Sequence, residues 1–129
     1  MIYVSLSTIP SRINTINKSI DSLMNQSLKP DKIFLNIPTY FKRFKETIID
    51  KDIPKLPDIV EITRCDDCGP GTKLLGSINK LKENSLIVLA DDDQIYEDYM
   101  LETFYKFYRK NPNNAYSFYV HPLGKFGIG

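Results

Sequence analysis

The feature that most constrains this chain is a short apolar run that ends in three aspartates. The run Leu86 to Ala90 is aliphatic and partly β-branched, and Asp91, Asp92 and Asp93 follow it at once. An apolar run of this length predicts a fully buried strand. In open α/β sheets the ligand crevice lies at the carboxyl ends of the strands, so we expect the three acids to lie at such a crevice.

Three adjacent carboxylates repel one another. A like-charge pair at ~4 Å costs roughly 1 kcal/mol in water and about 4 kcal/mol at an effective dielectric constant of 20. A fold tolerates this at a solvated surface or where a cation cancels the charge. Hard oxygen ligands at a strand end suit Mg²⁺ or Mn²⁺ that also holds a diphosphate. The alternative interpretation is a solvated turn that caps the next helix.

Apolar and polar stretches alternate along the whole chain in a way that predicts alternating strands and helices. The expected strands are about 2–7, 32–37, 59–63, 85–90 and 116–120, and the expected helices are about 11–26, 40–49, 72–83 and 97–110. Residues at helical spacing should face the sheet, namely Ile13, Ile16, Ile20, Leu23 and Met24 in one helix and Leu74, Leu75, Ile78 and Leu81 in another. We therefore expect an α/β fold, a mainly parallel sheet flanked by helices, in a single domain over 1–129.

The composition is that of an ordinary globular domain. Of 129 residues, 42% are hydrophobic and 26% charged, which suffices for a core, and the net charge of +1 argues against nucleic acid or an anionic membrane as the main partner. No apolar run approaches the ~20 residues of a membrane-spanning helix. Because the start of the chain has no basic segment before its apolar residues, it does not resemble a signal peptide, and we expect a cytoplasmic location.

Two further polar loops follow predicted strands and should reach the same edge of the sheet as the acids. In the loop Ser7 to Arg12, hydroxyls and helix-start amides suit a phosphate or a base edge, and Arg12 can pair with a diphosphate. In the loop Asp66 to Lys73, a carboxylate could serve a nucleoside and Lys73 a phosphate, although the segment is neither a Walker A loop nor a dinucleotide fingerprint. A simple helix cap and a tight turn capped by Thr72 are the alternatives.

The cysteines form a C-x-x-C pair, Cys65 and Cys68, and the chain has one histidine, His121. These three residues are too few for a confident closed zinc site. Two acids between the thiols would raise thiolate pKa values, whereas reactive motifs lower them. Reduced structural thiols and a structural or surface histidine are the simpler interpretation; redox chemistry, metal binding and a catalytic His121 are the alternatives.

Several segments resemble GT-A-fold glycosyltransferases, in the same order and over about three quarters of the chain. The closest likeness is to small family-2-like members, including modules of large DNA virus glycosyltransferases. The segments are Val4 to Arg12, Ser22 to Ser27, Pro30 to Pro38, Asp67 to Leu75, which is similar to a D-x-G-P-x-T-K-L-L motif, and Val88 to Tyr96, which contains a D-x-D motif.

This resemblance implies transfer of a hexose-type sugar from a nucleotide-diphosphate-sugar donor, a UDP-sugar first, to a glycan or other acceptor. It also implies Mn²⁺ or Mg²⁺, which would neutralise the leaving nucleoside diphosphate. By position in the motifs, Asp93 and Asp91 would hold the metal, Asp92 would lie near the ribose or donor sugar, and Thr8, Arg12, Asp67 and Lys73 would line the nucleotide site.

The chain departs from the family in its second half. Inverting GT-A enzymes take their catalytic base from the region after the D-x-D motif, but here Asp98 and Glu102 are the last acidic side chains, both on a predicted helix. The resemblance thus covers the donor half of an incomplete GT-A fold and leaves the catalytic base unassigned.

Several alternatives stay open. The chain is an unusual enzyme, a donor-binding half completed by a partner chain or by a missing C-terminal region, or a nucleotide-sugar-binding module or truncated remnant without turnover. A Mg²⁺-dependent phosphotransfer domain is disfavoured, because it would need an acidic nucleophile at the end of the first strand, where Ser5 and Ser7 stand instead.

Overall fold

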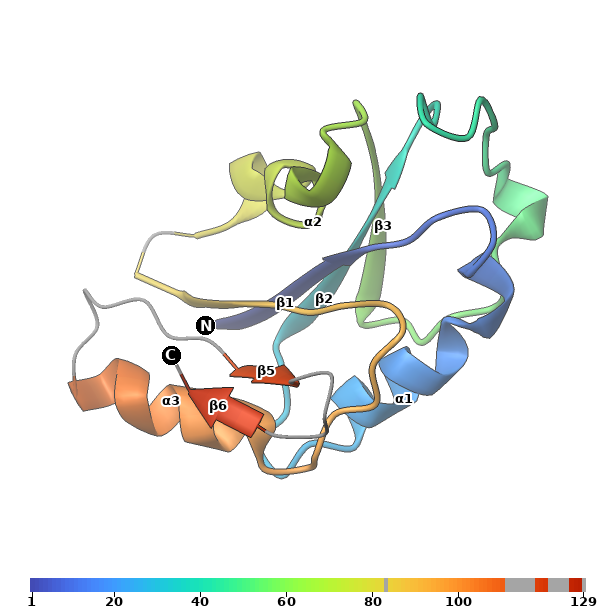
Figure 1. Ribbon diagram of the computed structural model, residues 1–129. Coiled ribbons are helices and arrows are strands. Elements are labelled where there is room, and N and C mark those ends of the chain that lie inside the picture. Colours follow the sequence, from blue (N-terminus) through green and yellow to red (C-terminus); the bar gives the residue numbers. More distant parts are fainter. Residues whose placement is uncertain (83, 111–117, 121–125, 129) are drawn as a thin grey trace.

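The fold is α/β, built around a parallel sheet. The computed structural model describes residues 1–82, 84–110, 118–120 and 126–128 (Figure 1). The sheet contains β1 (Ile2–Ser7), β2 (Lys32–Pro38), β3 (Val60–Cys65) and β4 (Leu86–Leu89) in the order β3-β2-β1-β4, all parallel. Consecutive strands are joined by crossovers that include helices, as the alternating pattern predicts.

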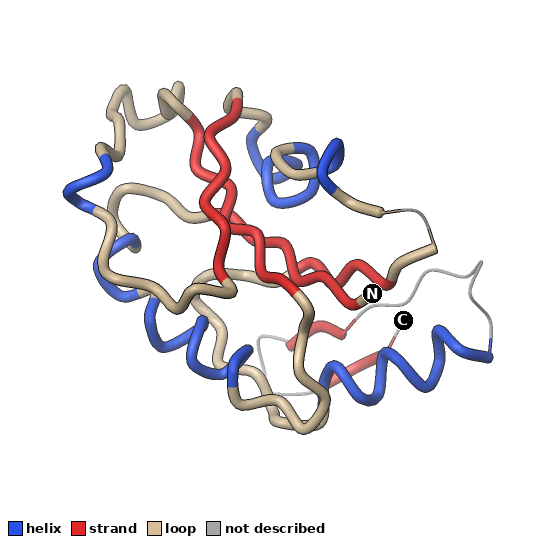
Figure 2. Tube along the Cα trace, turned by 180° about the vertical axis from the view of Figure 1, so that it is seen from behind, coloured by secondary structure: helices blue, strands red, loops and turns tan. Residues whose placement is uncertain are grey.

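Helices cover both faces of the sheet. The α-helices are α1 (Asn17–Met24), α2 (Thr72–Leu75) and α3 (Met100–Lys110), and short 3₁₀ helices span Ile13–Thr15 (η1), Asp50–Asp52 (η2), Gly69–Gly71 (η3) and Ile78–Lys80 (η4). Helices α1 and α3 lie on one face and α2 on the other, an arrangement also visible from behind (Figures 1 and 2). In the described part of the chain, no helix combines the length and hydrophobicity needed to cross a membrane.

The expected fifth strand forms in part and pairs elsewhere. Strand β5 (Phe118–Val120) pairs antiparallel with β6 (Phe126–Ile128) in a separate two-stranded sheet. Tyr116 and Ser117 of that expected strand, and His121, lie outside the described residues.

The sheet face toward α1 and α3 is apolar and forms the core. Val88, Val4 and Ile33 lie side by side in register across three strands and are buried. The helices contribute Ile13, Ile16, Ile20, Leu23, Met100, Leu101 and Phe104 to this cluster. Burial of each such side chain stabilises the fold by about 1.5–3 kcal/mol, so this face supplies most of the hydrophobic stabilisation.

The face toward α2 is polar where the helix docks. The Asn36 side-chain amide donates to the backbone carbonyl oxygens of Thr72 and Lys73 at 3.0 and 3.1 Å. The Thr63 hydroxyl donates to the side-chain oxygen Oδ1 of Asn36. The Ser5 hydroxyl donates to the Lys73 carbonyl and lies 2.8 Å from the Ser77 hydroxyl. The Thr72 carbonyl also accepts from the Gly76 N–H at 3.1 Å, so the side chains of the sheet add directional contacts that fix where α2 sits.

A buried glutamine joins the ends of two helices. Gln26, 1% exposed just after α1, donates to the Glu97 carbonyl at 2.7 Å and accepts from the Leu101 backbone N–H at 3.0 Å. One side chain thereby satisfies a carbonyl and an amide at the start of α3, which aligns the two helices on the same face of the sheet.

The prediction of a helix at 40–49 is wrong. This segment is a compact loop in which Phe41 and Glu46 form an isolated antiparallel bridge, and Lys45 has a φ of 52°. A left-handed residue inside the segment is incompatible with a continuous right-handed helix. Burial of Phe41, which is 4% exposed, outweighs the local helical pattern.

The prediction of a helix at 72–83 is also wrong, both in the length of the helix and in the residues expected to face the sheet. The α-helical part ends at Leu75, and Leu75 and Ile78 are 51% and 48% exposed. The buried positions belong instead to Thr72 and Ser77. The prediction from apolar spacing is wrong here because the sheet beneath this helix presents the polar side chains of Ser5 and Asn36 rather than an apolar surface.

The other boundaries differ less. The helix expected at 11–26 begins as η1 and becomes α-helical at Asn17, with no side-chain cap from Ser11, and the helix expected at 97–110 begins at Met100. Strand β4 is not buried on both faces, because it lies at the sheet edge and Leu89 is 44% exposed.

Replacement of Gly76 by alanine should destabilise the fold by roughly 1–3 kcal/mol, as overpacking does. A Cβ at this position would lie 2.7 Å from both Cβ and Cγ of Asn36 and 3.0 Å from Cys65 Sγ, so α2 would have to move from the sheet. Urea unfolding measures the change. Gly71→Ala is the matched control, because its Cβ would meet only the Leu75 side chain, at 3.4 Å or more. Equal stabilities of the two variants would contradict close docking of α2.

Candidate functional site

The carboxyl ends of the strands open into a cleft of about 570 Å³. Its walls come from the four loops that follow β1, β2, β3 and β4. Because the strands are parallel, these loops meet at one edge of the sheet, as the sequence predicts for three of them. Of the candidate residues, Thr8, Arg12, Asp67, Lys73, Asp91 and Asp92 all line the cleft.

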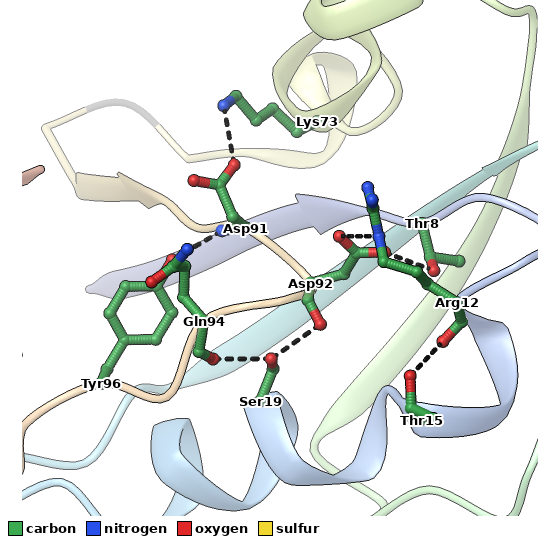
Figure 3. Close-up of polar contacts among 9 residues, drawn as sticks. All are labelled: Thr8, Arg12, Thr15, Ser19, Lys73, Asp91, Asp92, Gln94 and Tyr96. Carbon is green, nitrogen blue, oxygen red and sulfur yellow. Dashed lines mark hydrogen bonds and ion pairs between the residues drawn. The ribbon is translucent and has the colours of Figure 1, made fainter. Parts of the chain in front are cut away.

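Asp92 is the buried centre of this site (Figure 3). Its side chain is 4% exposed. The Thr8 hydroxyl donates to Asp92 Oδ2 at 2.7 Å, and Arg12 Nε lies 3.0 Å from both carboxylate oxygens. The Ser19 hydroxyl of α1 contacts the Asp92 carbonyl at 2.8 Å and the Gln94 carbonyl at 2.6 Å. The carboxylate therefore joins the loop after β4 to the loop after β1. The hydrogen bonds that it accepts offset the free-energy cost of burying its charge.

Arg12 retains donors for a ligand. Among the described residues only its Nε is engaged, with Asp92, which leaves the terminal Nη groups available at the cleft. The hydrogen bond to Asp92 raises the pKa of Arg12, with Asp93 and Asp91 acting in the same direction. A permanently charged, oriented guanidinium is well suited to pair with a phosphate in bidentate geometry.

Asp91 and Lys73 face each other across the cleft. Lys73 Nζ lies 3.2 Å from Asp91 Oδ1, and both side chains are partly exposed. The Asp91 backbone N–H donates to the Tyr96 hydroxyl at 2.7 Å, and burial raises the Tyr96 pKa to about 12, so the phenol stays neutral. Asp93 is exposed and does not line the cleft.

Asp67 organises the two loops on the far side. Its Oδ1 accepts from the Gly69 N–H at 2.9 Å and its Oδ2 from the Lys42 N–H at 2.9 Å. These two backbone hydrogen bonds, with Gly69 the larger influence, lower the pKa of Asp67. The Cys68 N–H donates to Thr72 Oγ1, which fastens the same loop to the start of α2.

Asp91, at the cleft, could hold a divalent cation whose other ligands come from a bound molecule. Asp91 already accepts a cationic group, the Lys73 ammonium, and Asp93 adds a second exposed carboxylate two residues later. No three potential ligands among His, Cys, Asp and Glu gather within the described residues. One or two carboxylates completed by phosphates and water are the usual set for Mg²⁺, so the donors suit a metal that arrives with a diphosphate.

The sequence pattern missed two contributions to the site. The loop after β2 brings Phe41, Lys42, Arg43 and Phe44 to the cleft, although the segment was expected to be a helix. The available signal was the mixture of basic and aromatic residues directly after a strand end. Ser19 could not have been found, because a serine within an amphipathic helix carries no sign that it bonds a carbonyl 73 residues away.

The cysteine pair lies next to the cleft as free thiols. Cys65 is half-buried and Cys68 exposed. Burial raises the pKa of the Cys65 thiol, and Cys68, Asp66 and Asp67 add to the effect. This disfavours the thiolate that redox and zinc chemistry need.

The acids that follow the D-x-D motif lie away from the cleft. Glu102 Oε2 accepts from the Ser27 hydroxyl at 3.4 Å, and the Asp98 carbonyl accepts from the Ser27 N–H at 2.7 Å. Between residues 97 and 110, no carboxylate of the described chain lines the cleft.

Comparison with models of known protein families and with curated proteins finds no match to this chain. The likeness to GT-A-fold glycosyltransferases therefore depends on the sequence motifs alone.

Asp92→Asn should lower the free energy of unfolding by roughly 1–3 kcal/mol, because the charged acceptor of Arg12 and Thr8 is lost from a buried position. Chemical denaturation measures this change. Asp93→Asn is the matched control in the same turn and should stay within about 0.5 kcal/mol of the wild type, since its side chain is exposed. A larger effect of Asp93 than of Asp92 would contradict the central role of Asp92.

Proposed function

We propose that this cleft binds a nucleotide-diphosphate-sugar together with Mn²⁺ or Mg²⁺, and that the protein is a glycosyltransferase that transfers the sugar to a glycan or other acceptor. One observation carries the proposal most strongly. The three loops that resemble donor-binding segments of GT-A enzymes, after β1, β3 and β4, converge on one cleft that offers oriented cations. The GT-A assignment of the α/β fold is part of the same proposal.

The cationic side chains suit a diphosphate. Arg12 presents its Nη groups from beside Asp92, and Lys73 reaches toward Asp91 from the opposite wall. Asp92 orients Arg12, and Thr8 in turn orients Asp92, so the guanidinium is held before any ligand arrives. Preorganised charges of this kind stabilise developing negative charge without reorganisation, which is what departure of a nucleoside diphosphate requires.

Asp91 and Asp93 are the residues that would hold the metal ion. Bound there, the ion supplies charge neutralisation of the leaving diphosphate. A phosphate in the cleft would draw the Lys73 ammonium away from Asp91, since the same cation can pair with either anion. Lys73 would then bind the ligand while Asp91 becomes available.

The second candidate function is a nucleotide-sugar-binding module without turnover. It is favoured by the position of the carboxylates in the segment 97–110, because within the described chain none of them reaches the cleft to act as a base. In that case the chain would bind the donor and the metal but release no sugar to water or to an acceptor. Turnover separates the two functions: release of sugar from the donor would exclude the binding module.

Calorimetric titration of UDP-, GDP- and dTDP-sugars should show binding of one nucleotide class that depends on Mn²⁺. Asp91→Asn should weaken this binding roughly tenfold or more, a loss of about 1.4 kcal/mol, because a metal-ligand carboxylate is removed. Asp52→Asn, in the exposed helix η2 outside the cleft, is the matched control and should bind as the wild type does. A folded wild-type chain without affinity for any of these nucleotides would refute the proposal.

A further inference from the structure

The loop that follows β2 is held firmly, although it lies on the surface. The Phe41 N–H donates to the Glu46 carbonyl at 2.8 Å, and the Lys45 N–H donates to the Phe41 carbonyl at 2.7 Å. The Lys42 N–H is bound by Asp67 of the neighbouring loop. Phe41 itself is buried in the core. Four attachments within six residues give the tip of this loop a defined position at the cleft.

The tip brings an aromatic ring and a guanidinium together at the cleft. Phe44 packs against Phe41 with ring centroids 6.4 Å apart, and the guanidinium carbon of Arg43 lies 5.4 Å from the centroid of the Phe44 ring. Phe44 is 36% exposed, and both residues line the cleft. We call Phe44 and Arg43 the aromatic platform.

Charge is distributed unequally along the cleft. At the β4 end, Asp91 pairs with Lys73 and Asp92 pairs with Arg12. At the β2 end, neither Lys42 nor Arg43 pairs with a carboxylate within the described residues, and the Asp67 carboxylate accepts from two backbone amides. At the platform end two cations therefore lie beside Phe44 without an ion-pair partner among the described residues, whereas at the opposite end each cation is paired with a carboxylate.

The β2 end and the β4 end of the cleft are far enough apart to bind two different parts of one ligand. Strands β2 and β4 are the neighbours of β1 on either side, so their ends lie two strand spacings, roughly 10 Å, apart. A ligand whose diphosphate lies at the Asp91 end can therefore reach the loop after β2 with its other end.

We propose that the aromatic platform holds the base of the nucleotide by stacking. This inference rests on the proposed function, since it assigns one part of the same ligand. The exposed Phe44 ring offers a π face and the neighbouring Arg43 guanidinium a delocalised cation, and groups of both kinds stack on a planar base. Such stacking accepts any base, so the platform contributes affinity for the nucleoside while other contacts select which base is bound.

The test compares a ligand with a base and a ligand without one. UDP and inorganic pyrophosphate, each with Mn²⁺, are titrated calorimetrically into the wild type and into Phe44→Leu, which keeps an apolar contact with Phe41 but removes the π face. Loss of base stacking is worth about 1–3 kcal/mol, so UDP binding should weaken about 5- to 150-fold while pyrophosphate binding stays unchanged. Phe44→Tyr should restore UDP binding.

A control and a spectroscopic signature sharpen the test. Tyr40→Leu removes a more exposed aromatic ring from the same loop, 46% exposed and outside the cleft lining, and should change neither affinity. In NMR spectra recorded with diamagnetic Mg²⁺ in place of Mn²⁺, the uracil H5 and H6 signals of bound UDP should move upfield in the wild type by the ring current of Phe44. This shift should disappear in Phe44→Leu.

The outcomes separate this inference from the proposed function. UDP binding that is equal in wild type and Phe44→Leu, with no upfield shift, would overturn the platform assignment and leave the nucleotide site standing. An equal loss of UDP and pyrophosphate in Phe44→Leu would also overturn it, because the ring would then act on the diphosphate or on the loop as a whole. A folded wild type that binds neither probe, and none of the GDP- and dTDP-sugars, would refute the proposed function itself.

Discussion

The cleft depends on one buried carboxylate more than on any other group. Asp92 accepts from Thr8 and Arg12, and its own carbonyl accepts from Ser19 of α1. The stretch from Thr8 to Ser19 and the loop after β4, which are distant in sequence, therefore meet at a single residue. Without these donors a carboxylate at 5% exposure would carry a large desolvation penalty. The same contacts that remove this penalty also hold Arg12 at the cleft, so one set of hydrogen bonds both stabilises the fold and shapes the cleft.

The two faces of the sheet serve different purposes. The face toward α1 and α3 is apolar, whereas the face toward α2 carries Ser5, Asn36 and Thr63. Polar docking costs hydrophobic stabilisation, but it gives α2 a defined position, because hydrogen bonds require direction as well as contact. Lys73 lies on α2, and its place opposite Asp91 follows from that docking. The polar face thus sets the width of the cleft.

Sequence reasoning succeeded where a local pattern and its environment agree. The range of β1 was predicted without error, and the inward residues Ile16, Ile20 and Leu23 of α1 are buried as expected, because their environment is a plain apolar core. It failed at Tyr40 to Ile49 and at Leu75 and Ile78. There a buried phenylalanine and a polar sheet face, supplied by distant residues, decide the structure. Candidate site residues were found because their position at strand ends is itself a local signal.

The sequence by itself determined the alternation of strands and helices, the parallel sheet and the edge at which the polar loops meet, since these follow from hydrophobic periodicity and from the direction of parallel strands. Only the tertiary structure decided how the acids divide their roles. Asp91, Asp92 and Asp93 are identical in chemistry and adjacent in sequence, yet one pairs with Lys73 at the cleft, one is buried against Arg12 and one is exposed. Their difference comes from which donors lie within hydrogen-bonding distance, and those donors belong to segments about 20 to 80 residues away.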